Sequence, residues 1–323
     1  MKLLVTGGAG YIGSHTVKHL VEHGHEVVVL DNFSRGHRWA ARWGSVEEVD
    51  LLDLESLTAA LRRHQVDAVM HFAAFALVGE SVRNPELYYR NNFVGSLNLL
   101  QAMVANQVSR LVFSSTCAVY GNPHSQKLAE DHPKNPVNPY GHSKLMVEQM
   151  IDDFRHAHGL QACCLRYFNA AGCDPGLETG EVHDPETHLI PCIFNSLVSG
   201  KPLQLYGTDY ATPDGTCVRD YVHVLDLASA HRLALEKLGQ CQTVYNLGTG
   251  RGFSVREVIA AVEKVTGRRV MVQESARRPG DPPSLVAAGG RAQHDLGWTP
   301  AWTDLEATVA SAWRWHCQYF CQA

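Results

Sequence analysis

The first 32 residues constrain the fold of this chain more than any other stretch. An apolar run at Lys2–Thr6 predicts a buried strand, a helical pattern extends over Tyr11–His23, and a second apolar run, Glu26–Leu30, predicts another strand. The turn between the first strand and the helix contains three regularly spaced glycines, Gly7, Gly10 and Gly13. Strand, glycine turn, helix and strand in this order predict a βαβ unit, from which parallel sheets are built.

Each glycine of this turn has a separate task in such a unit. Gly7 permits the tight turn, Gly10 lets the backbone approach a pyrophosphate, and Gly13 lets helix and strand pack closely. The positive end of the helix then faces the phosphates. Asp31, at the tip of the second strand, is placed to accept hydrogen bonds from a ribose diol and would repel a 2′-phosphate. The stretch therefore predicts a site for NAD rather than NADP.

Strand and helix patterns continue to alternate as far as about residue 169. Further strands are expected at Val46–Val49, Ala68–Phe72, Arg110–Ser114 and Gln161–Tyr167. Helices are expected between them at Leu54–His64, Glu86–Asn106 and Tyr140–His158. This alternation predicts an α/β fold with a Rossmann-type, doubly wound parallel sheet, whose ligands bind at the carboxyl ends of the strands.

The pattern changes after Asn169, where segments rich in Gly, Pro and Asp separate shorter elements. Helices are expected at His188–Ser199, Leu225–Leu238, Ser254–Thr266 and Asp304–Trp315, and a strand at Thr243–Leu247. That strand is expected to return to the main sheet. We therefore expect an NAD-binding domain at residues 1–169, with a return segment at about 220–250, and a smaller, discontinuous α/β substrate-binding lobe at 170–219 and 251–323.

Composition excludes several classes of protein. A chain of 323 residues with 45% apolar and 19% charged residues is typical of a soluble globular protein of one or two domains. A net charge of −5 gives no broad basic surface, so no nucleic-acid partner is expected. No run approaches the ~18 apolar residues of a membrane span, so no membrane association is expected. Nine cysteines without C-x-x-C pairs fit reduced thiols, which predicts a cytoplasmic protein.

No metal site is expected from the sequence. His15, His19 and His23 fall on one side of the first helix at a spacing that metal ligands could use. Lys18 and Glu22 share that side, so we interpret it as a solvated helix face.

A tyrosine and a lysine one turn apart open the helix expected at Tyr140–His158. Tyr140 and Lys144 share a helix face, and the ammonium group, together with a cationic nicotinamide ring, would lower the pKa of the phenol toward that of a general base. Three hydroxyl residues, Ser114, Ser115 and Thr116, leave a predicted strand at its carboxyl end. Of these we choose Thr116 as the hydrogen-bond partner of the oxygen being oxidised.

Motifs along nearly the whole chain resemble a known family. They are Thr6–His15 (TGGAGYIGSH), Asp31-Asn32, His71–Ala74, Val78–Ser81, Ser114–Gly121, Pro139–Lys144, Leu165–Asn169, Gly215–Val224 (GTCVRDYVHV) and Tyr245–Gly248. The glycine spacing resembles that of the extended short-chain dehydrogenases/reductases, and the full set resembles the UDP-glucose 4-epimerases. The resemblance implies an NAD-dependent sugar-nucleotide epimerase that forms a homodimer through its two long helices.

The resemblance also implies a role for each matching residue. The catalytic residues would be Tyr140, Thr116 and Lys144. NAD would be bound by Gly7, Gly10, Tyr11, Ile12, Gly13, Asp31, Asn32, Asp50, Leu51, Phe72, Ala73, Asn91, Ser114, Tyr140, Lys144 and Tyr167. The UDP-sugar would be bound by Thr116, Asn169, His188, Leu189, Tyr206, Arg219, Arg278 and Asp281. Tyr140 would take the proton of the sugar 4-hydroxyl while a hydride passes from C4 to NAD, and the 4-keto sugar would turn over and receive the hydride on its other face.

Departures from the family pattern leave alternative substrates and reactions open. Residues Ala74–Ala76 lack a lysine that some epimerases have, and His188 stands where some relatives have asparagine. Leu285 matches a wall of the sugar pocket where a tyrosine would crowd an N-acetyl group, so UDP-GlcNAc and UDP-GalNAc are further candidate substrates. UDP-arabinose/xylose and UDP-glucuronate 4-epimerases share the same C4 chemistry. Nucleotide-sugar dehydratases and decarboxylases are disfavoured, because Cys117-Ala118 fill the positions where those enzymes carry carboxylates. A non-catalytic NAD-sensing protein could lose the catalytic side chains that this chain retains.

Overall fold

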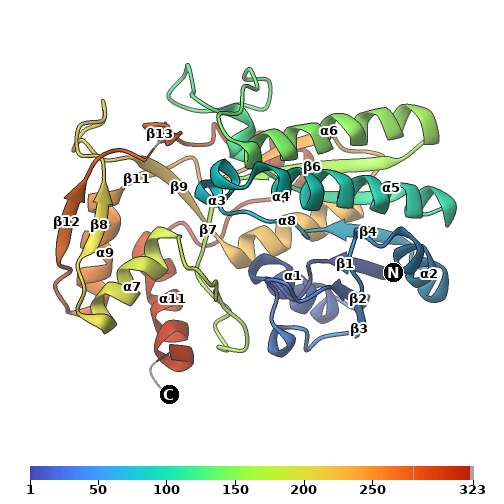
Figure 1. Cartoon of the computed structure of the whole chain (residues 1–323), viewed down its shortest axis with the longest axis horizontal. Coiled ribbons are helices and arrows are strands. Elements are labelled where there is room, and N and C mark those ends of the chain that lie inside the picture. Colours follow the sequence, from blue (N-terminus) through green and yellow to red (C-terminus); the bar gives the residue numbers. More distant parts are fainter. Residues whose placement is uncertain (279, 321–323) are drawn as a thin grey trace.

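The chain forms a large parallel sheet with a smaller lobe at one end, in a computed structural model that describes residues 1–278 and 280–320 (Figure 1). The sheet has seven parallel strands in the order β10-β6-β5-β4-β1-β2-β3. Their bounds are β1 (Lys2–Thr6), β2 (Glu26–Asp31), β3 (Ser45–Glu48), β4 (Ala68–His71), β5 (Arg110–Thr116), β6 (Gln161–Tyr167) and β10 (Val244–Leu247). The strand order reverses between β1 and β4, which makes the sheet doubly wound. The predicted Rossmann-type fold is confirmed.

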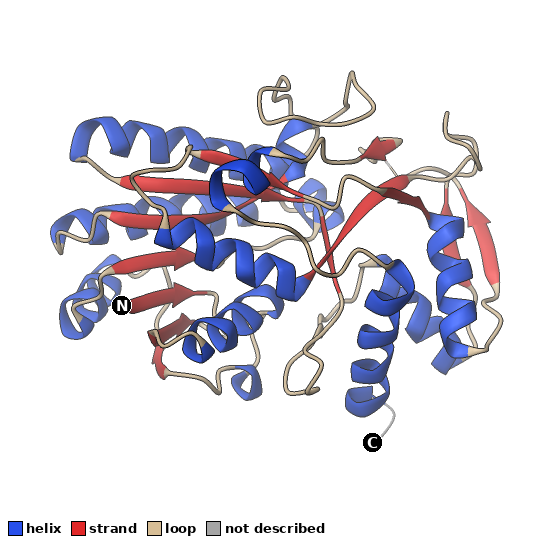
Figure 2. Ribbon diagram, turned by 180° about the vertical axis from the view of Figure 1, so that it is seen from behind, coloured by secondary structure: helices blue, strands red, loops and turns tan. Residues whose placement is uncertain are grey.

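Helices cover both faces of this sheet (Figure 2). One layer contains α1 (Tyr11–Glu22) and α8 (Val224–Glu236), and the other contains α2 (Leu54–His64), α5 (Gly95–Ala105) and α6 (Pro139–His158). Because successive side chains of a strand point to opposite faces, Leu3 and Val5 of β1 join the core under the first layer while Leu4 joins the core under the second. A strand buried on both faces has no polar alternation, which explains the continuous apolar run in the sequence.

The smaller lobe is built around α7 (Leu189–Ser199), α9 (Val255–Thr266) and α11 (Leu305–Phe320), whose apolar faces form a third core. Its strands are β7 (Asn169–Ala171), β8 (Leu203–Tyr206), β9 (Val218–His223), β11 (Gly252–Ser254), β12 (Val272–Ser275) and β13 (Ser284–Leu285). β9 lies between β11 and β13 and also pairs with β7, while β8 pairs with β12. The chain thus passes from β9 in this lobe to α8 and β10 on the large sheet and back again. The domain boundaries drawn from the sequence remain a prediction.

The long helix expected at Glu86–Asn106 is interrupted. α3 (Val78–Arg83) and α4 (Pro85–Tyr88) are short, and a π-helical segment, Tyr89–Val94, separates α4 from α5. Within the π-helical segment Asn92 is buried, and its side chain accepts a hydrogen bond from the Phe75 amide and donates one to the Phe75 carbonyl. Periodicity along the chain does not report such bonds to a distant loop. The remaining short helices are α10 (Arg291–Leu296) and 3₁₀ turns at Arg38–Ala40 and Cys117–Tyr120.

The interpretation of the first helix as carrying a solvated histidine face is wrong for His15. This side chain is buried, and its Nε2 accepts a hydrogen bond from the Asp174 amide at 3.1 Å. Burial lowers the pKa of His15 to about 4, so the ring stays neutral and can act as the acceptor. The smaller lobe shields His15 from solvent, and this burial cannot be predicted from the sequence of the helix alone.

Among the described helices, none is both long and apolar enough to cross a membrane.

Candidate active site

A cavity of about 690 Å³ opens at the carboxyl ends of the large sheet, where the smaller lobe meets it. All of the residues predicted to be catalytic or to bind NAD line this cavity. The predicted substrate residues that line it are Thr116, Asn169, His188, Leu189, Arg219 and Asp281. Strand ends that are far apart in the sequence therefore meet at one site, as the doubly wound fold requires.

Tyr206 and Arg278 do not line this cavity. The Arg278 guanidinium lies 4.0 Å from the centroid of the Tyr206 ring, and Arg278 lines a second cavity that shares Gly280 and Asp281 with the first. Arg219, in contrast, lies within the main cavity, with its Nη2 3.4 Å from the Asp281 carboxylate. The UDP-binding role expected for Tyr206 and Arg278 stays a prediction.

Two glycines of the turn after β1, Gly7 and Gly13, stand where no side chain fits. A Cβ at Gly13 would lie 2.2 Å from the Gly7 carbonyl oxygen, and one at Gly7 would lie 2.5 Å from the Ala73 amide nitrogen. Gly7 also has a φ of +69°, which favours glycine. Gly10 precedes α1, and no side chain caps its free amide groups. A backbone cradle at a helix N-terminus suits a phosphate group, so these residues fit the pyrophosphate of NAD.

Asp31 at the end of β2 is held by the backbone. Its carboxylate accepts hydrogen bonds from the Ala9 amide at 3.0 Å and the Phe33 amide at 2.9 Å, and burial raises its pKa. Asn32 beside it donates to the Asp50 carboxylate at 3.0 Å. These groups place acceptors around the same end of the cavity, which fits the ribose and adenine side of a dinucleotide.

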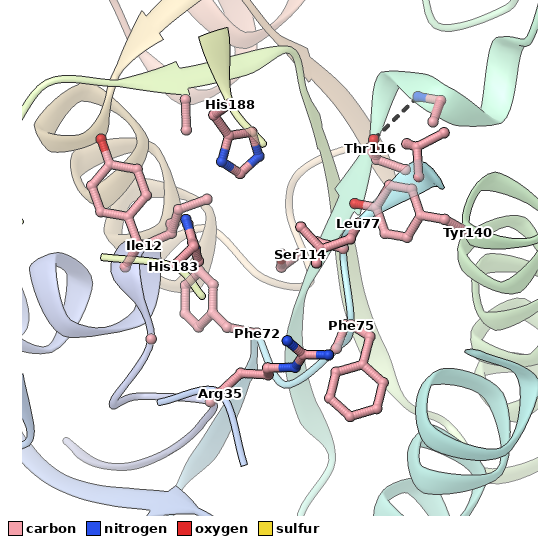
Figure 3. Close-up of a pocket in the computed structure, with 18 of the residues that line it drawn as sticks. Ile12, Arg35, Phe72, Phe75, Leu77, Ser114, Thr116, Tyr140, His183 and His188 are labelled. Carbon is pink, nitrogen blue, oxygen red and sulfur yellow. Dashed lines mark hydrogen bonds between the residues drawn. The ribbon is translucent and has the colours of Figure 1, made fainter. Parts of the chain in front are cut away.

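Tyr140, Thr116 and Lys144 meet at one end of the cavity, and Figure 3 shows Tyr140 beside Thr116, across from His183. The Asn138 side chain accepts from the Gly141 amide and so caps the first turn of α6, which contains Tyr140. The Thr116 hydroxyl accepts from the Ala118 amide at 3.1 Å. These contacts fix both hydroxyl-bearing side chains at the carboxyl end of β5.

The protein's own groups supply only part of the expected electrostatics, because the lowered pKa of Tyr140 was expected from Lys144 together with a bound nicotinamide ring. Burial raises the pKa of Tyr140 above its usual value, and the Thr116 hydroxyl offsets this only in part. Lys144 donates from its Nζ to the Ser114 carbonyl at 2.8 Å, and burial lowers its pKa to about 7. Lys144 is therefore only partly charged at neutral pH. The lowered tyrosine pKa expected from Lys144 is not produced by the protein's own groups.

Sequence reasoning missed a bridge at the mouth of the cavity. Arg35 donates to the Glu80 carboxylate and to the Asp184 carbonyl, both at 2.8 Å, and its guanidinium lies 5.4 Å from the centroid of the Phe75 ring. Arg35, Phe75 and Asp184 lie in three separate loops and Glu80 lies in α3, and all four line the cavity. Arg35 belongs to no motif with a known spacing, so only the tertiary structure reveals this contact.

A parallel sheet with a glycine turn and a Tyr–Lys pair that lines the same cavity defines the chain as an NAD-binding protein of the Rossmann type. The sequence model of the NAD dependent epimerase/dehydratase family matches residues 3–248, and the chain belongs to this family.

Proteins of known name resemble the chain over nearly its full length. UDP-glucose 4-epimerases of Halalkalibacterium halodurans and Streptomyces lividans are 48% and 49% identical to it, covering 99% and 98% of this chain and 96% and 97% of their own. The crystal structure of UDP-glucose 4-epimerase from Brucella ovis in complex with NAD has 47% identity, covers 97% of each chain and gives a TM-score of 0.93. The enzyme from Bifidobacterium longum, in complex with NAD+ and UDP, has 36% identity, covers 99% of each chain and gives a TM-score of 0.95.

Proposed function

We propose that this protein is an NAD-dependent UDP-glucose 4-epimerase, which interconverts UDP-glucose and UDP-galactose through a 4-keto intermediate. The observation that carries the proposal is the meeting of Tyr140 and Thr116 with the glycine turn and Arg219 around a single cavity. The named relatives with 48% and 49% identity support the same activity.

Each catalytic side chain has one task in this proposal. The Tyr140 phenol takes the proton of the sugar 4-hydroxyl and later returns one, while the Thr116 hydroxyl holds the same oxygen. Lys144 donates a hydrogen bond to the Ser114 carbonyl, and its amino group is protonated in only part of the molecules at neutral pH. NAD, when bound, supplies the hydride acceptor and donor and a positive ring charge that favours the phenolate.

The substrate side must hold UDP firmly and the sugar loosely, because inversion requires the sugar to present both faces. We assign Arg219 as the donor to the diphosphate, since it lines the cavity and a guanidinium matches phosphate oxygens. Tyr206 and Arg278, stacked beside the neighbouring cavity, are proposed to contact UDP from that side. Binding energy from the nucleotide then holds a sugar that makes few contacts of its own.

Elimination of water is disfavoured by the residues that follow Thr116. Cys117 and Ala118 line the cavity there, and burial raises the pKa of the Cys117 thiol to about 12. A thiol that stays protonated at neutral pH does not replace the carboxylate expected in dehydratases. This argument favours epimerisation over the alternative reactions of related folds.

The test is turnover of UDP-galactose by the Tyr140→Phe variant, with UDP-glucose separated and quantified. Loss of a general base lowers the rate by about 10² to 10⁴-fold. Tyr319→Phe, at an exposed tyrosine of α11, is the matched control and should keep the wild-type rate. Unchanged turnover in Tyr140→Phe, with NAD still bound, would refute the mechanism.

A wider substrate range is a second proposal, which rests on Leu285. This β13 side chain lines the cavity and is buried. A structure titled as a UDP-Glc/GlcNAc 4-epimerase from Campylobacter jejuni is 41% identical and gives a TM-score of 0.85. We expect the wild type to convert UDP-GlcNAc as well as UDP-glucose, and Leu285→Tyr to lose the acetylated substrate selectively. No conversion of UDP-GlcNAc by the wild type would remove this proposal.

The homodimer and the cytoplasmic location are proposed as well. The segment leading through α5 exposes the apolar side chains of Leu87, Val94 and Val104, and α5 packs beside α6. Two copies could bury these faces against each other. The thiols of Cys117, Cys163, Cys164, Cys173, Cys192, Cys217 and Cys241 are free, which fits a reducing compartment. Sedimentation of the wild type and of Val94→Glu tests the dimer, because a charge at that face should shift the mass toward one chain.

A further inference from the structure

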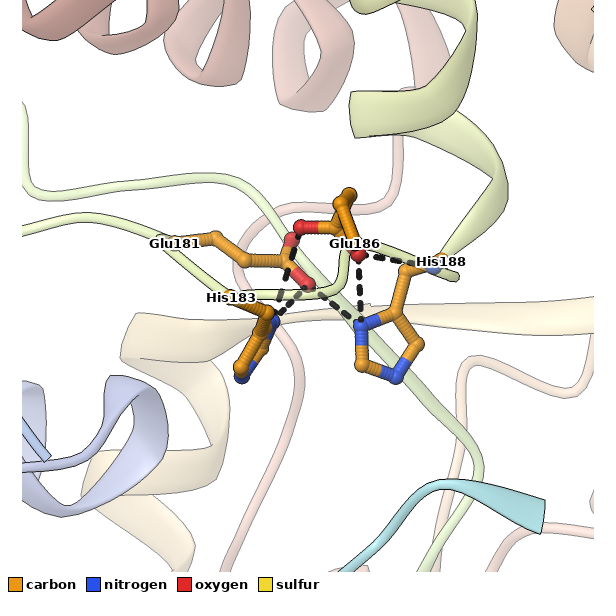
Figure 4. Close-up of side chains that lie close together, drawn as sticks. All are labelled: Glu181, His183, Glu186 and His188. Carbon is orange, nitrogen blue, oxygen red and sulfur yellow. Dashed lines mark hydrogen bonds and ion pairs between the residues drawn. The ribbon is translucent and has the colours of Figure 1, made fainter. Parts of the chain in front are cut away.

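Four side chains with metal-ligating groups converge in the loop between β7 and α7 (Figure 4). They are Glu181, His183, Glu186 and His188, and one ligand atom of each lies within 4.8 Å of all the others. We propose that this cluster is a binding site for a divalent first-row transition-metal ion, with Zn²⁺ the ion that fits best. No metal site was expected from the sequence, which carries the four residues at the spacing Glu-x-His-x-x-Glu-x-His.

Two of the distances between the ligand atoms match the edges of a tetrahedral site. Zinc binds imidazole nitrogen and carboxylate oxygen at about 2.0–2.2 Å, so neighbouring ligands of a tetrahedral ion lie about 3.3–3.6 Å apart. His183 Nδ1 lies 3.3 Å from a Glu181 oxygen and 3.5 Å from a Glu186 oxygen. His188 Nδ1 lies 2.7 Å from the same Glu181 oxygen, and 3.5 Å from Glu186 Oε1 rather than from the Oε2 atom that lies near His183. The two edges from His183 need no movement, whereas the edge between His188 and Glu181 must lengthen by roughly 0.6 Å for a tetrahedral ion.

The orientation of these atoms is wrong for hydrogen bonds. Glu181 Oε1, His183 Nδ1 and His188 Nδ1 are all buried, and both ring nitrogens lie within ion-pairing distance of the carboxylate oxygen, but none of the three makes a well-directed hydrogen bond. The Glu181 side chain is only 9% exposed, so its oxygen cannot turn to bulk water. A buried carboxylate and two buried ring nitrogens that face one another without hydrogen bonds are costly. A cation at the point on which they converge would satisfy all three.

The surrounding residues hold the loop in this shape. Glu186 Oε1 accepts from the backbone amides of Thr187 and His188, which fixes the carboxylate and leaves Oε2 to face the cluster. The carbonyls of Glu181 and Val182 accept from the side chains of Trp315 and His37 at 3.1 and 3.0 Å. Such outer contacts orient ligands before an ion arrives.

The donor set selects the kind of ion. Two imidazoles and two carboxylates suit zinc and its first-row neighbours, whereas calcium and magnesium prefer oxygen ligands alone. The two carboxylates also balance the charge of a divalent cation. Four protein ligands make a closed site, which is typical of a structural rather than a catalytic ion.

Binding here would act on the neighbouring cavity through His188. Its Nδ1 faces the cluster while the residue lines the cavity. An ion on Nδ1 leaves the proton on Nε2, which fixes the ring as a hydrogen-bond donor. This link to UDP rests on the proposed function, but the metal site itself does not.

The test measures metal rather than turnover. The purified protein is stripped with a chelator, dialysed and titrated with ZnCl₂ in a calorimeter, and bound zinc is counted by mass spectrometry after gel filtration. We expect one tight equivalent per chain and a raised melting temperature. Co²⁺ in place of Zn²⁺ should give the intense visible bands of a tetrahedral site, which surface ions do not give.

Matched variants decide whether the zinc lies in this cluster. Loss of an outer contact lowers metal affinity by about 10 to 100-fold. Glu186→Gln and His183→Ala each remove a proposed ligand and should therefore weaken Zn²⁺ binding by more than that. His64→Ala removes a histidine that is paired with a single carboxylate, Glu47, and should bind zinc as the wild type does. NAD binding and circular dichroism check that each variant is folded. The proposal would be overturned if the wild type bound no tight equivalent of Zn²⁺. It would also be overturned if folded Glu186→Gln and His183→Ala bound Zn²⁺ as tightly as the wild type.

Discussion

The buried ion pair between Glu148 and Arg166 should be the polar contact whose loss destabilises this fold most. Glu148 of α6 accepts from Arg166 Nε at 2.8 Å and from Nη2 at 2.5 Å, and the two side chains are 6% and 1% exposed. Ser115 also donates to the same carboxylate, and Arg166 donates to the Tyr120 hydroxyl. The pair therefore joins α6, β5 and β6 directly behind the catalytic end of the cavity.

The magnitude follows from burial rather than from distance. Glu148→Gln keeps the shape of the side chain but leaves the Arg166 charge buried without a counter-charge, which costs about 3–5 kcal/mol. The pair between Arg38 and Glu48 has two contacts of 2.7 Å, but its side chains are 68% and 55% exposed. Glu48→Gln should therefore cost at most about 1 kcal/mol, because water screens that pair.

Urea unfolding of wild type, Glu148→Gln and Glu48→Gln, followed by tryptophan fluorescence at pH 7.5, measures both costs. A third variant, Glu148→Leu combined with Arg166→Met, should recover much of the lost stability, because it removes both buried charges together. Equal losses in the two single variants would refute the argument that burial sets the energy of these pairs.

Two further predictions concern the cofactor cradle and acid stability. Gly13→Ala should abolish co-purification of NAD and lower stability, because the added Cβ would lie 2.2 Å from the Gly7 carbonyl oxygen. Gly79→Ala is the control, since its Cβ would meet nothing closer than 3.9 Å, and it should leave the NAD content unchanged. His71 is buried between the hydroxyls of Thr6 and Ser96, and burial lowers its pKa to about 3. Below the ordinary histidine pKa of about 6.5 the unfolded chain takes up a proton that folded His71 does not, so this residue lowers stability by about 1.4 kcal/mol per pH unit as the pH falls from about 6.5 toward 3. Between pH 7.5 and 5 the wild type should therefore lose about 2 kcal/mol more unfolding free energy than His71→Asn, and equal losses would contradict the shift.

Much of the large domain could be predicted because its signals are local. The apolar run of β1, the glycines after it and the acid that ends β2 depend on residues within about 30 positions of one another. The strands of the smaller lobe were harder to predict from the sequence. Its strands β7, β9, β11 and β13 are two to six residues long and pair with partners far along the chain, so no periodic signal marks them.

The sequence by itself determined the order of the βαβ units, the glycine cradle and the spacing of Tyr140 and Lys144, because backbone sterics and helical geometry act between near neighbours. Only the tertiary structure decided the charges and contacts of the site. Burial raised the pKa of Tyr140 and lowered that of Lys144, and packing of the smaller lobe buried His15. Desolvation depends on every group that surrounds a side chain, and these groups come together only when distant segments fold against one another.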